Sequence, residues 1–140
     1  MTPAIIDPNR PPIRVEISAN EDVVLVRQRA REQAQRAGFS LLEATKLVTA
    51  ASELARNTLE HGGGGTADIE VITDGLRRGV RMTFVDEGPG IPDLEAALRD
   101  GFTTGGGLGL GLGGSRRLVN EFHIESVVGV GTRVQVIRWK

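Results

Sequence analysis

The sequence predicts an α+β fold, a two-layer sandwich in which helices cover one face of a mixed β-sheet. Two observations support this prediction: apolar side chains recur at helical spacing in some segments and alternate with polar ones in others. The segments follow one another as a strand, two helices, two strands, a loop region, a helix and two strands. Because strands and helices do not alternate strictly, a layered sandwich is favoured over a doubly wound sheet.

The first half of the chain is predicted to hold one strand and two helices. Residues 13–17 alternate apolar and polar side chains, which is the period of a half-buried strand. A helix follows with Asn20 as its expected cap, and Gly38 suits the position just after its end. The run Ser40-Leu-Leu-Glu43 is a capping box, which opens a second helix that we expect to stop at Gly62.

The second half is predicted to supply four more strands and two helices. Residues rich in β-branched and apolar side chains mark the strands, and glycines mark several of the turns between them. The expected elements are strands at 67–73 and 80–86, a short helix at 93–100, a helix from residue 108 or 110 to residue 121, and strands at 122–128 and 132–139.

Length and composition narrow the class of protein. The 140 residues suit one domain, expected over residues 13–140 after an irregular, proline-rich lead-in at residues 1–12. A net charge of −1 gives no basic excess for nucleic acid or an anionic membrane surface. The chain has no cysteine and two histidines, which excludes disulfides and argues against a zinc site. No apolar run approaches the ~20 residues of a membrane span, and the N-terminus lacks a signal-peptide core, so we expect a cytoplasmic protein.

Glycines are concentrated between residues 101 and 114, where several alternate with leucines ahead of a predicted helix. Such a loop exposes backbone N–H groups, and the start of a helix adds roughly half a positive elementary charge, so the two together suit a triphosphate. The loop is neither a Walker A motif nor a dinucleotide fingerprint. The alternative is a flexible linker, which would be serine-rich and would not interleave leucines. A second glycine run at residues 62–65 receives no role.

The second predicted helix carries Glu53 and Asn57 one turn apart on the same face. A carboxylate and a carboxamide at this spacing can hold Mg²⁺ with a water molecule, or orient a hydroxyl group. Asparagine is a mediocre residue inside a helix because its amide competes for backbone hydrogen bonds. The alternative is an exposed polar face on which Arg56 and Glu60 form an ion pair.

The run Asp86-Glu-Gly88-Pro-Gly90 follows a predicted strand. An aspartate at a strand end, ahead of two glycines in a tight turn, can direct its carboxylate into a pocket. There it can accept a hydrogen bond from an exocyclic amine such as that of adenine. The alternative is a plain turn, because aspartate, glycine and proline all favour turns.

Taken in order, these three motifs and Gly131-Thr132 ahead of the last strand resemble the ATP site of the GHKL superfamily, the Bergerat fold. The resemblance covers nearly the whole chain from Ile13 and matches the N-box at residues 53–61, the G1-box at 86–90 and the G2-box at 105–111. The lid between Gly90 and Gly105 is short, which argues against the gyrase-, MutL- and Hsp90-like members. No phosphoacceptor helical hairpin stands upstream, which argues against a complete sensor histidine kinase.

Within the superfamily, the chain is similar to the serine/threonine kinases of the anti-sigma regulatory group, and most of all to the stressosome switch kinases. Four runs and the end of the chain carry this narrower resemblance. The runs are Ser52-Glu-Leu-Ala-Arg-Asn57, Asp86-Glu-Gly-Pro-Gly-Ile-Pro-Asp93, Asp100-Gly-Phe-Thr-Thr-Gly-Gly-Gly-Leu-Gly109 and Arg117-Leu-Val-Asn-Glu-Phe122, and the ending is similar at Gly131-Thr132 and Trp139-Lys140.

The resemblance implies a role for each motif. Asp86 would accept a hydrogen bond from the adenine amine, with Thr132 supporting it through water. Asn57 would coordinate a Mg²⁺ ion that bridges the phosphates, and Glu53 would be the general base toward the substrate hydroxyl. Arg56 is a further candidate contact to phosphate. The implied ATP-binding residues are Asn57, Asp86, Gly88, Gly90, Thr104, Gly105, Gly106, Gly107, Leu108, Gly109, Leu110, Gly111 and Thr132.

The implied function is an ATP-dependent serine/threonine protein kinase. Its substrate would be a STAS-domain protein of a stressosome-like scaffold, and the released kinase would activate a PP2C-type phosphatase. One alternative is an anti-sigma factor that acts mainly by binding a sigma factor. Another is an ATPase that needs no protein acceptor. A degenerate nucleotide binder is disfavoured because Glu53, Asn57 and Asp86 are all present. The oligomeric state stays open.

Overall fold

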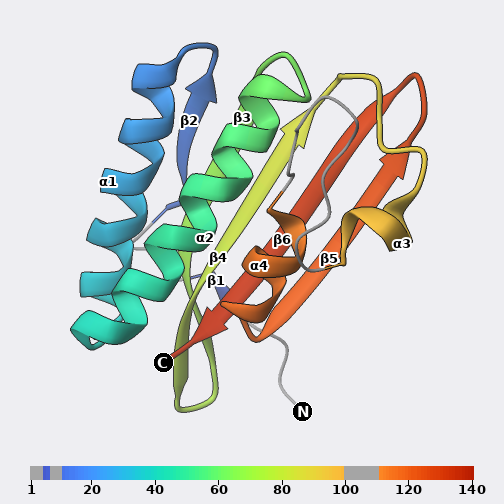
Figure 1. Cartoon of the computed structure of the whole chain (residues 1–140). Helices are drawn as coiled ribbons and strands as arrows, with labels where there is room; N and C mark the ends of the chain where they lie inside the picture. Colours follow the sequence, from blue (N-terminus) through green and yellow to red (C-terminus); the bar gives the residue numbers. More distant parts are fainter. Residues whose placement is uncertain (1–4, 7–10, 100–110) are drawn as a thin grey trace.

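An antiparallel β-sheet forms one layer of the molecule, and two long helices lie side by side on one of its faces (Figure 1). The computed structural model describes residues 5–6, 11–99 and 111–140. The elements are β1 (Ile5–Ile6), β2 (Ile13–Ile17), α1 (Asn20–Arg36), α2 (Leu41–Glu60), β3 (Gly65–Asp74), β4 (Arg77–Asp86), α3 (Leu94–Ala97), α4 (Leu112–Arg117), β5 (Glu121–Val127) and β6 (Gly131–Trp139).

The strand order is β1-β3-β4-β6-β5, with β2 also paired to β3. The predicted α+β sandwich is therefore confirmed, but the expected mixed sheet is wrong, because every pairing among the described strands is antiparallel. The reason lies in the connections. A single helical crossover joins parallel strands. Here α1 and α2 form a helical hairpin, so the chain leaves β2 and re-enters the sheet antiparallel to it in β3 (Figure 1).

The lead-in, expected to be irregular, contains the short strand β1. Its two residues pair with β3 at Ile72 and Thr73. β2 occupies the same edge of β3 only as far as Ile69, so the remaining part of that edge is open for another strand. Two consecutive β-branched residues favour extended backbone, which suits them to this position.

Both long helices begin with reciprocal hydrogen bonds. The capping box predicted for α2 is confirmed: Glu43 N–H donates to Ser40 Oγ over 3.1 Å, and Ser40 N–H donates to Glu43 Oε1 over 2.9 Å. The cap predicted for α1 is wrong, because Ala19 precedes the helix and Asn20 is its first residue. There Asp22 accepts from the N–H groups of Ser18 and Ala19, so a carboxylate in the first turn performs the capping.

These two capping carboxylates are expected to make the stability of the protein depend on pH in the acidic range. The backbone N–H of Ser18 above all holds the pKa of Asp22 below its ordinary 3.8, and that of Ser40 holds the pKa of Glu43 below its ordinary 4.5. A carboxyl group whose pKa is lower in the folded chain stabilises the fold above the unfolded pKa, and this contribution is lost as the pH falls through the folded pKa.

We therefore expect Asp22→Asn/Glu43→Gln to lower the melting temperature at neutral pH. The difference from wild type should shrink once the pH drops below about 4.5. Circular dichroism melts over a pH series that descends from neutral pH through the ordinary pKa values of 3.8 and 4.5 would measure it. A difference that stays constant over this range would contradict the assignment of stability to the two ionised caps.

The core lies between the sheet and the two long helices, and aliphatic side chains supply most of it. α1 and α2 each turn one apolar face toward the strands, as the helical spacing in the sequence predicts. Large side chains that are fully buried there include Ile17, Val26, Leu47, Leu54, Ile69, Met82, Phe84 and Leu112.

The helix expected to reach residue 121 is shorter, because α4 ends at Arg117. The next residues hydrogen-bond to the end of β6. Asn120 N–H donates to the carbonyl of Ile137 over 2.9 Å, and Asn120 Oδ1 accepts from Trp139 N–H over 2.7 Å. These bonds with a strand distant in sequence replace the helical ones. Residues 108–110, where this helix was expected to begin, lie outside the described part of the chain.

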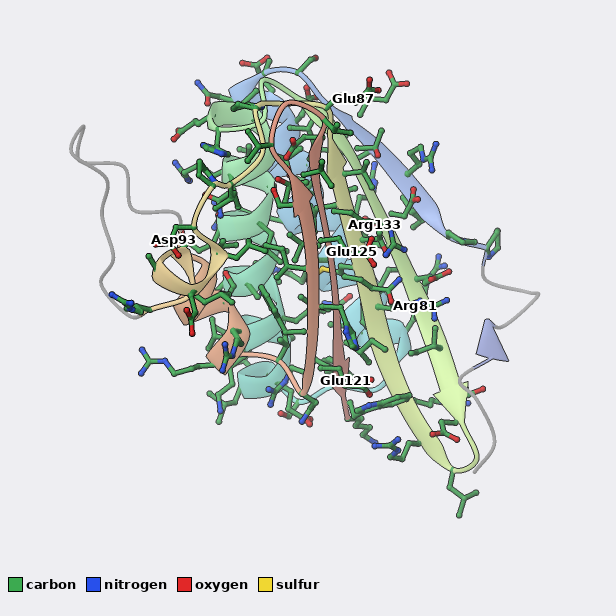
Figure 2. The ribbon with its side chains drawn as sticks, turned by 90° about the vertical axis from the view of Figure 1, so that its right-hand side faces the viewer. Arg81, Glu87, Asp93, Glu121, Glu125 and Arg133 are labelled. Carbon is green, nitrogen blue, oxygen red and sulfur yellow. The ribbon has the colours of Figure 1, made fainter. Side chains whose placement is uncertain are left out.

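The face of the sheet opposite the helices is largely polar. Figure 2 shows Arg81, Glu121, Glu125 and Arg133 on this side. Arg81 forms an ion pair with Glu70 over 2.6 Å. A small second cluster of Ile72, Ile137 and Trp139 is buried on the same face. Among the described helices, none combines the length and the apolar character that a bilayer crossing requires.

Candidate functional site

A pocket lies between α2 and the ends of β4 and β6. Both apolar and polar side chains line it, and the free volume inside it is small, about 20 Å³. Asn57, Asp86 and Thr132, which come from three separate sequence motifs, all contribute to it. The lining residues are Leu54, Asn57, Thr58, His61, Phe84, Asp86, Ile91, Leu112, Thr132 and Val134.

Asp86 is the last residue of β4, and the sheet sets its position. It lies opposite Gly65 of β3 and Thr132 of β6. Its Oδ1 accepts a hydrogen bond from Gly88 N–H over 2.9 Å, which closes the turn that follows the strand. A carboxylate accepts several hydrogen bonds, so this contact leaves capacity for a donor in the pocket. The run from Asp86 to Gly90 thus forms a turn, as the second interpretation predicts, while its first residue lines the pocket, as the first interpretation predicts.

The glycine run after α2 has a structural reason that the sequence alone did not reveal. A Cβ built on Gly62 would lie 2.4 Å from Asp86 Cγ, and a Cβ built on Gly88 would lie 2.6 Å from Gly62 Cα. A Cβ on Gly65 would lie 2.0 Å from the carbonyl oxygen of Val85. The end of α2 therefore packs directly on the turn after β4, and the only signal in the sequence was the glycine run itself.

Gly62→Ala tests this packing. Its Cβ would displace the Asp86 carboxylate or shift the end of α2, and such overpacking typically costs about 1–3 kcal/mol. If Asp86 binds a nucleotide, we expect the affinity to fall by roughly tenfold. Isothermal calorimetry would measure the affinity and a thermal melt would measure the stability. Gly114→Ala is the control, because Gly114 is exposed and, among the described residues, a Cβ there meets no atom within 4 Å outside its own helix. Unchanged affinity and stability in Gly62→Ala would contradict the contact.

The turn after β4 is held from two sides. His61 Nε2 lies 3.0 Å from the carbonyl oxygen of Gly90, and because a carbonyl only accepts, this nitrogen carries the proton. On the other side, Gly129 N–H donates to the carbonyl of Pro89 over 2.9 Å. Gly90 has a φ of +77°, and a Cβ on it would lie 2.5 Å from Val127 O, so glycine is required there. His61 gave no sequence signal beyond its place at the end of the helix motif.

Thr132 is buried and belongs to a small hydrogen-bond network. Its Oγ1 lies 2.8 Å from Ser126 Oγ on β5, and Ser126 Oγ also accepts from Ile91 N–H over 2.8 Å. The network connects the last two strands to the segment after Gly90. Sequence reasoning missed Ser126, because a serine in a strand has many explanations and its partners are distant in sequence.

Glu53 and Asn57 are both half-buried on α2. A Cβ on Gly111 would lie 2.5 Å from Glu53 Oε2, so the carboxylate lies against the residue that precedes α4. Gly111 has a φ of +66°, a conformation that favours glycine.

The other predicted site residues do not contribute to the described pocket. Arg56 is exposed and is not among the residues that line it. The remaining predicted loop residues, Thr104, Gly105, Gly106, Gly107, Leu108, Gly109 and Leu110, lie outside the described part of the chain.

Comparison with known proteins places this site in a family context. Residues 43–140 match the family described as histidine kinase-, DNA gyrase B-, and HSP90-like ATPase. The serine/threonine-protein kinase RsbT of Bacillus subtilis is 43% identical over 125 residues, which cover 89% of this chain and 94% of RsbT. An anti-sigma F factor of Geobacillus stearothermophilus is 38% identical over 100 residues, 66% of each chain.

Solved structures show the same fold at lower identity. A structure of the RsbU and RsbW domains of a Mycobacterium tuberculosis protein matches with a TM-score of 0.63 and 22% identity, covering 93% of this chain and 33% of that longer one. The catalytic domain of the histidine kinase ThkA matches with a TM-score of 0.52 and 18% identity, covering 90% of this chain and 95% of that domain. At this identity the structural matches support the fold alone.

Proposed function

Since the chain belongs to the histidine kinase-, DNA gyrase B-, and HSP90-like ATPase family, we propose that it transfers a phosphoryl group from ATP to a serine or threonine of a STAS-domain protein. The observation that carries the proposal is the pocket lined by Asn57, Asp86 and Thr132, with Glu53 one helical turn from Asn57. The 43% identity to a serine/threonine-protein kinase supports a protein acceptor rather than water.

The residues that line the pocket suit the base of ATP, although the base needs the pocket to open further than its free volume of about 20 Å³. Asp86 offers a carboxylate acceptor for the exocyclic amine of adenine, and Leu54, Phe84 and Ile91 provide apolar surface around it. Because Gly88 has no side chain, the turn after β4 packs against Gly62 at the end of α2, beside Asp86. In this proposal, Gly90 keeps the turn in place and the loop of residues 104–111 contacts the phosphates.

Asn57 is the residue that would hold Mg²⁺. Its carboxamide lines the pocket, and Glu53 lies one turn earlier on the same helix. This donor set fits Mg²⁺, which takes few protein oxygens and completes its shell with water and phosphate oxygens. When bound, the ion would neutralise part of the negative charge of the phosphates.

Glu53 is the proposed general base. Its carboxylate accepts the proton of the substrate hydroxyl as that oxygen bonds to the γ-phosphorus and the bond to the leaving ADP oxygen breaks. Phosphoryl transfer depends mainly on positioning and charge stabilisation, so a fixed base is valuable. Glu53 lies against Gly111, the last residue of the proposed phosphate-binding loop, and this contact supports the proposed role.

The proposal includes a second role in binding. After phosphorylating its stressosome-like STAS partner, the released kinase would activate a PP2C-type phosphatase in the cytoplasm. The similarity to RsbT and to anti-sigma factors supports this type of partner exchange. We expect neither nucleic acid nor a membrane among the partners, because the charge of −1 gives no basic excess.

A second candidate is an anti-sigma factor that acts by binding, which the 38% identity to an anti-sigma F factor favours. An ATPase without a protein acceptor is the third. A single-turnover assay with γ-labelled ATP and a purified STAS protein separates the three. The proposal expects label on the partner protein. ATP hydrolysis that is indifferent to the partner would support the ATPase, and tight sigma-factor binding without labelling would support the anti-sigma factor.

Asn57→Ala tests the proposed metal ligand. We expect the rate of transfer at limiting Mg²⁺ to fall by at least the roughly 10–100-fold that loss of an outer-shell partner costs at other metal sites. Affinity for ATP in the presence of EDTA should change much less. Asn57→Asp is the comparison, because it keeps an oxygen ligand but adds a charge near the phosphates, and we expect it to impair transfer less. A wild-type rate in Asn57→Ala would show that the ligand role is wrong.

A further inference from the structure

We propose that Ser126 is a positioning residue that orients the Thr132 hydroxyl as a hydrogen-bond donor and thereby favours a 6-aminopurine over a 6-oxopurine. The inference rests on the proposed nucleotide site. Thr132 lines the pocket, whereas Ser126 does not. Ser126 lies directly opposite Thr132 in the pairing of β5 with β6, and their hydroxyl oxygens are 2.8 Å apart.

The hydrogen bonds of Ser126 limit how its hydroxyl group is used. A serine oxygen has one proton and two lone pairs. Ile91 N–H occupies one lone pair over 2.8 Å. The proton of Ser126 has two acceptors in reach: Thr132 Oγ1 at 2.8 Å and the carbonyl oxygen of Gly131 at 3.4 Å. The first distance is typical of an O–H···O hydrogen bond and the second is long, so donation to Thr132 uses the proton better.

The direction of the hydrogen bond between Ser126 and Thr132 determines whether Thr132 acts as a donor or as an acceptor toward the pocket. If Ser126 donates to Thr132, the proton of Thr132 is free to point into the pocket, and Thr132 acts there as a donor. If Thr132 donates to Ser126 instead, it offers the pocket lone pairs only, and the proton of Ser126 is left with the long bond to Gly131. A water molecule between Thr132 and a ligand would act in the same direction, because a water that accepts from Thr132 keeps its own protons to donate to the ligand.

The resulting pattern matches one edge of a purine. Asp86 accepts and Thr132 donates, and both line the same pocket on adjacent strands. A 6-aminopurine presents the complement, with a donor at the amino group and an acceptor at N1. A 6-oxopurine presents the reverse, with an acceptor at O6 and a donor at N1. Its oxygen faces a carboxylate, and its N1–H requires the less favourable arrangement of the two hydroxyl groups.

The test is the ratio of ATP affinity to ITP affinity, measured by calorimetry on the whole chain. ITP differs from ATP only at the edge in question. We expect Ser126→Ala to lower this ratio by roughly three- to tenfold, because Thr132 can then rotate to accept. Ser126→Thr keeps a hydroxyl group and suits a strand, so it should restore the ratio. Ser115→Ala is the matched control, because Ser115 is also buried but its hydroxyl has no hydrogen-bond partner in the described part of the chain.

The outcomes separate this inference from the function on which it rests. If wild type binds neither nucleotide, the proposed nucleotide site falls and the inference with it. If wild type binds ATP but Ser126→Ala weakens ATP and ITP by the same factor, Ser126 only supports the fold and the inference alone is overturned. An unchanged ratio with unchanged affinities overturns it as well.

Discussion

Glu53→Gln is expected to remove most phosphoryl transfer while ATP binding stays close to wild type. Glutamine keeps the shape of the side chain and one hydrogen-bonding oxygen, but it does not take a proton at neutral pH. A general base typically contributes about 10²–10⁴-fold in rate, which corresponds to about 3–5 kcal/mol of the barrier. Because glutamine preserves the packing against Gly111, the loss should appear in the rate of transfer and not in folding.

A single-turnover assay with labelled ATP and a STAS-domain partner measures the rate, and calorimetry measures the affinity for ATP with Mg²⁺. Glu60→Gln is the matched control, since it makes the same change of charge at an exposed position of α2. Binding of the partner should survive in both variants. Transfer by Glu53→Gln at the wild-type rate would exclude Glu53 as the base. A parallel loss of stability in Glu53→Gln and Glu53→Ala would assign the residue a structural role instead.

Of the variants proposed for the pocket, Asp86→Ala is expected to lower the affinity for ATP the most. The adenine amine would lose its acceptor and be left in a partly apolar pocket. A hydrogen bond to a charged group contributes about 1.5–3 kcal/mol, so the affinity should fall by roughly 10–150-fold. The alanine variant also removes the acceptor for Gly88 N–H, which closes the turn. Asp86→Ala therefore changes the turn as well as the proposed adenine contact.

Asp86→Asn separates the two contributions. Asparagine retains an oxygen that can accept from Gly88 N–H, while its amide nitrogen is a donor that opposes the amine of adenine. We expect the melting temperature to stay near wild type while the affinity for ATP falls as in the alanine variant. Glu87→Gln is the control, because this neighbouring carboxylate is exposed and is not among the residues that line the pocket. Unchanged affinity of Asp86→Asn and Asp86→Ala for ATP would contradict the proposed adenine contact.

The sequence by itself determined the features that depend on neighbouring residues. The capping box at Ser40 and Glu43 and the position of Gly38, with a φ of +81°, follow from local hydrogen bonding and backbone preference, and both are present in the structure. The motifs around Asn57 and Asp86 could be found because each combines residue types with a fixed spacing. Their places in one pocket agree with the resemblance, whereas the chemical roles of the two side chains stay predictions.

Only the tertiary structure decided what depends on contacts between distant segments. α4 ends early because Asn120 bonds to β6, and β1 forms because β2 leaves part of the edge of β3 open. The same holds for Ser126, whose hydroxyl acquires its partners when β5 pairs with β6. Gly62 lies against Asp86 because α2 ends on the turn after β4. Periodicity and spacing describe one segment at a time, whereas these contacts arise when the sheet brings together segments far apart in the chain.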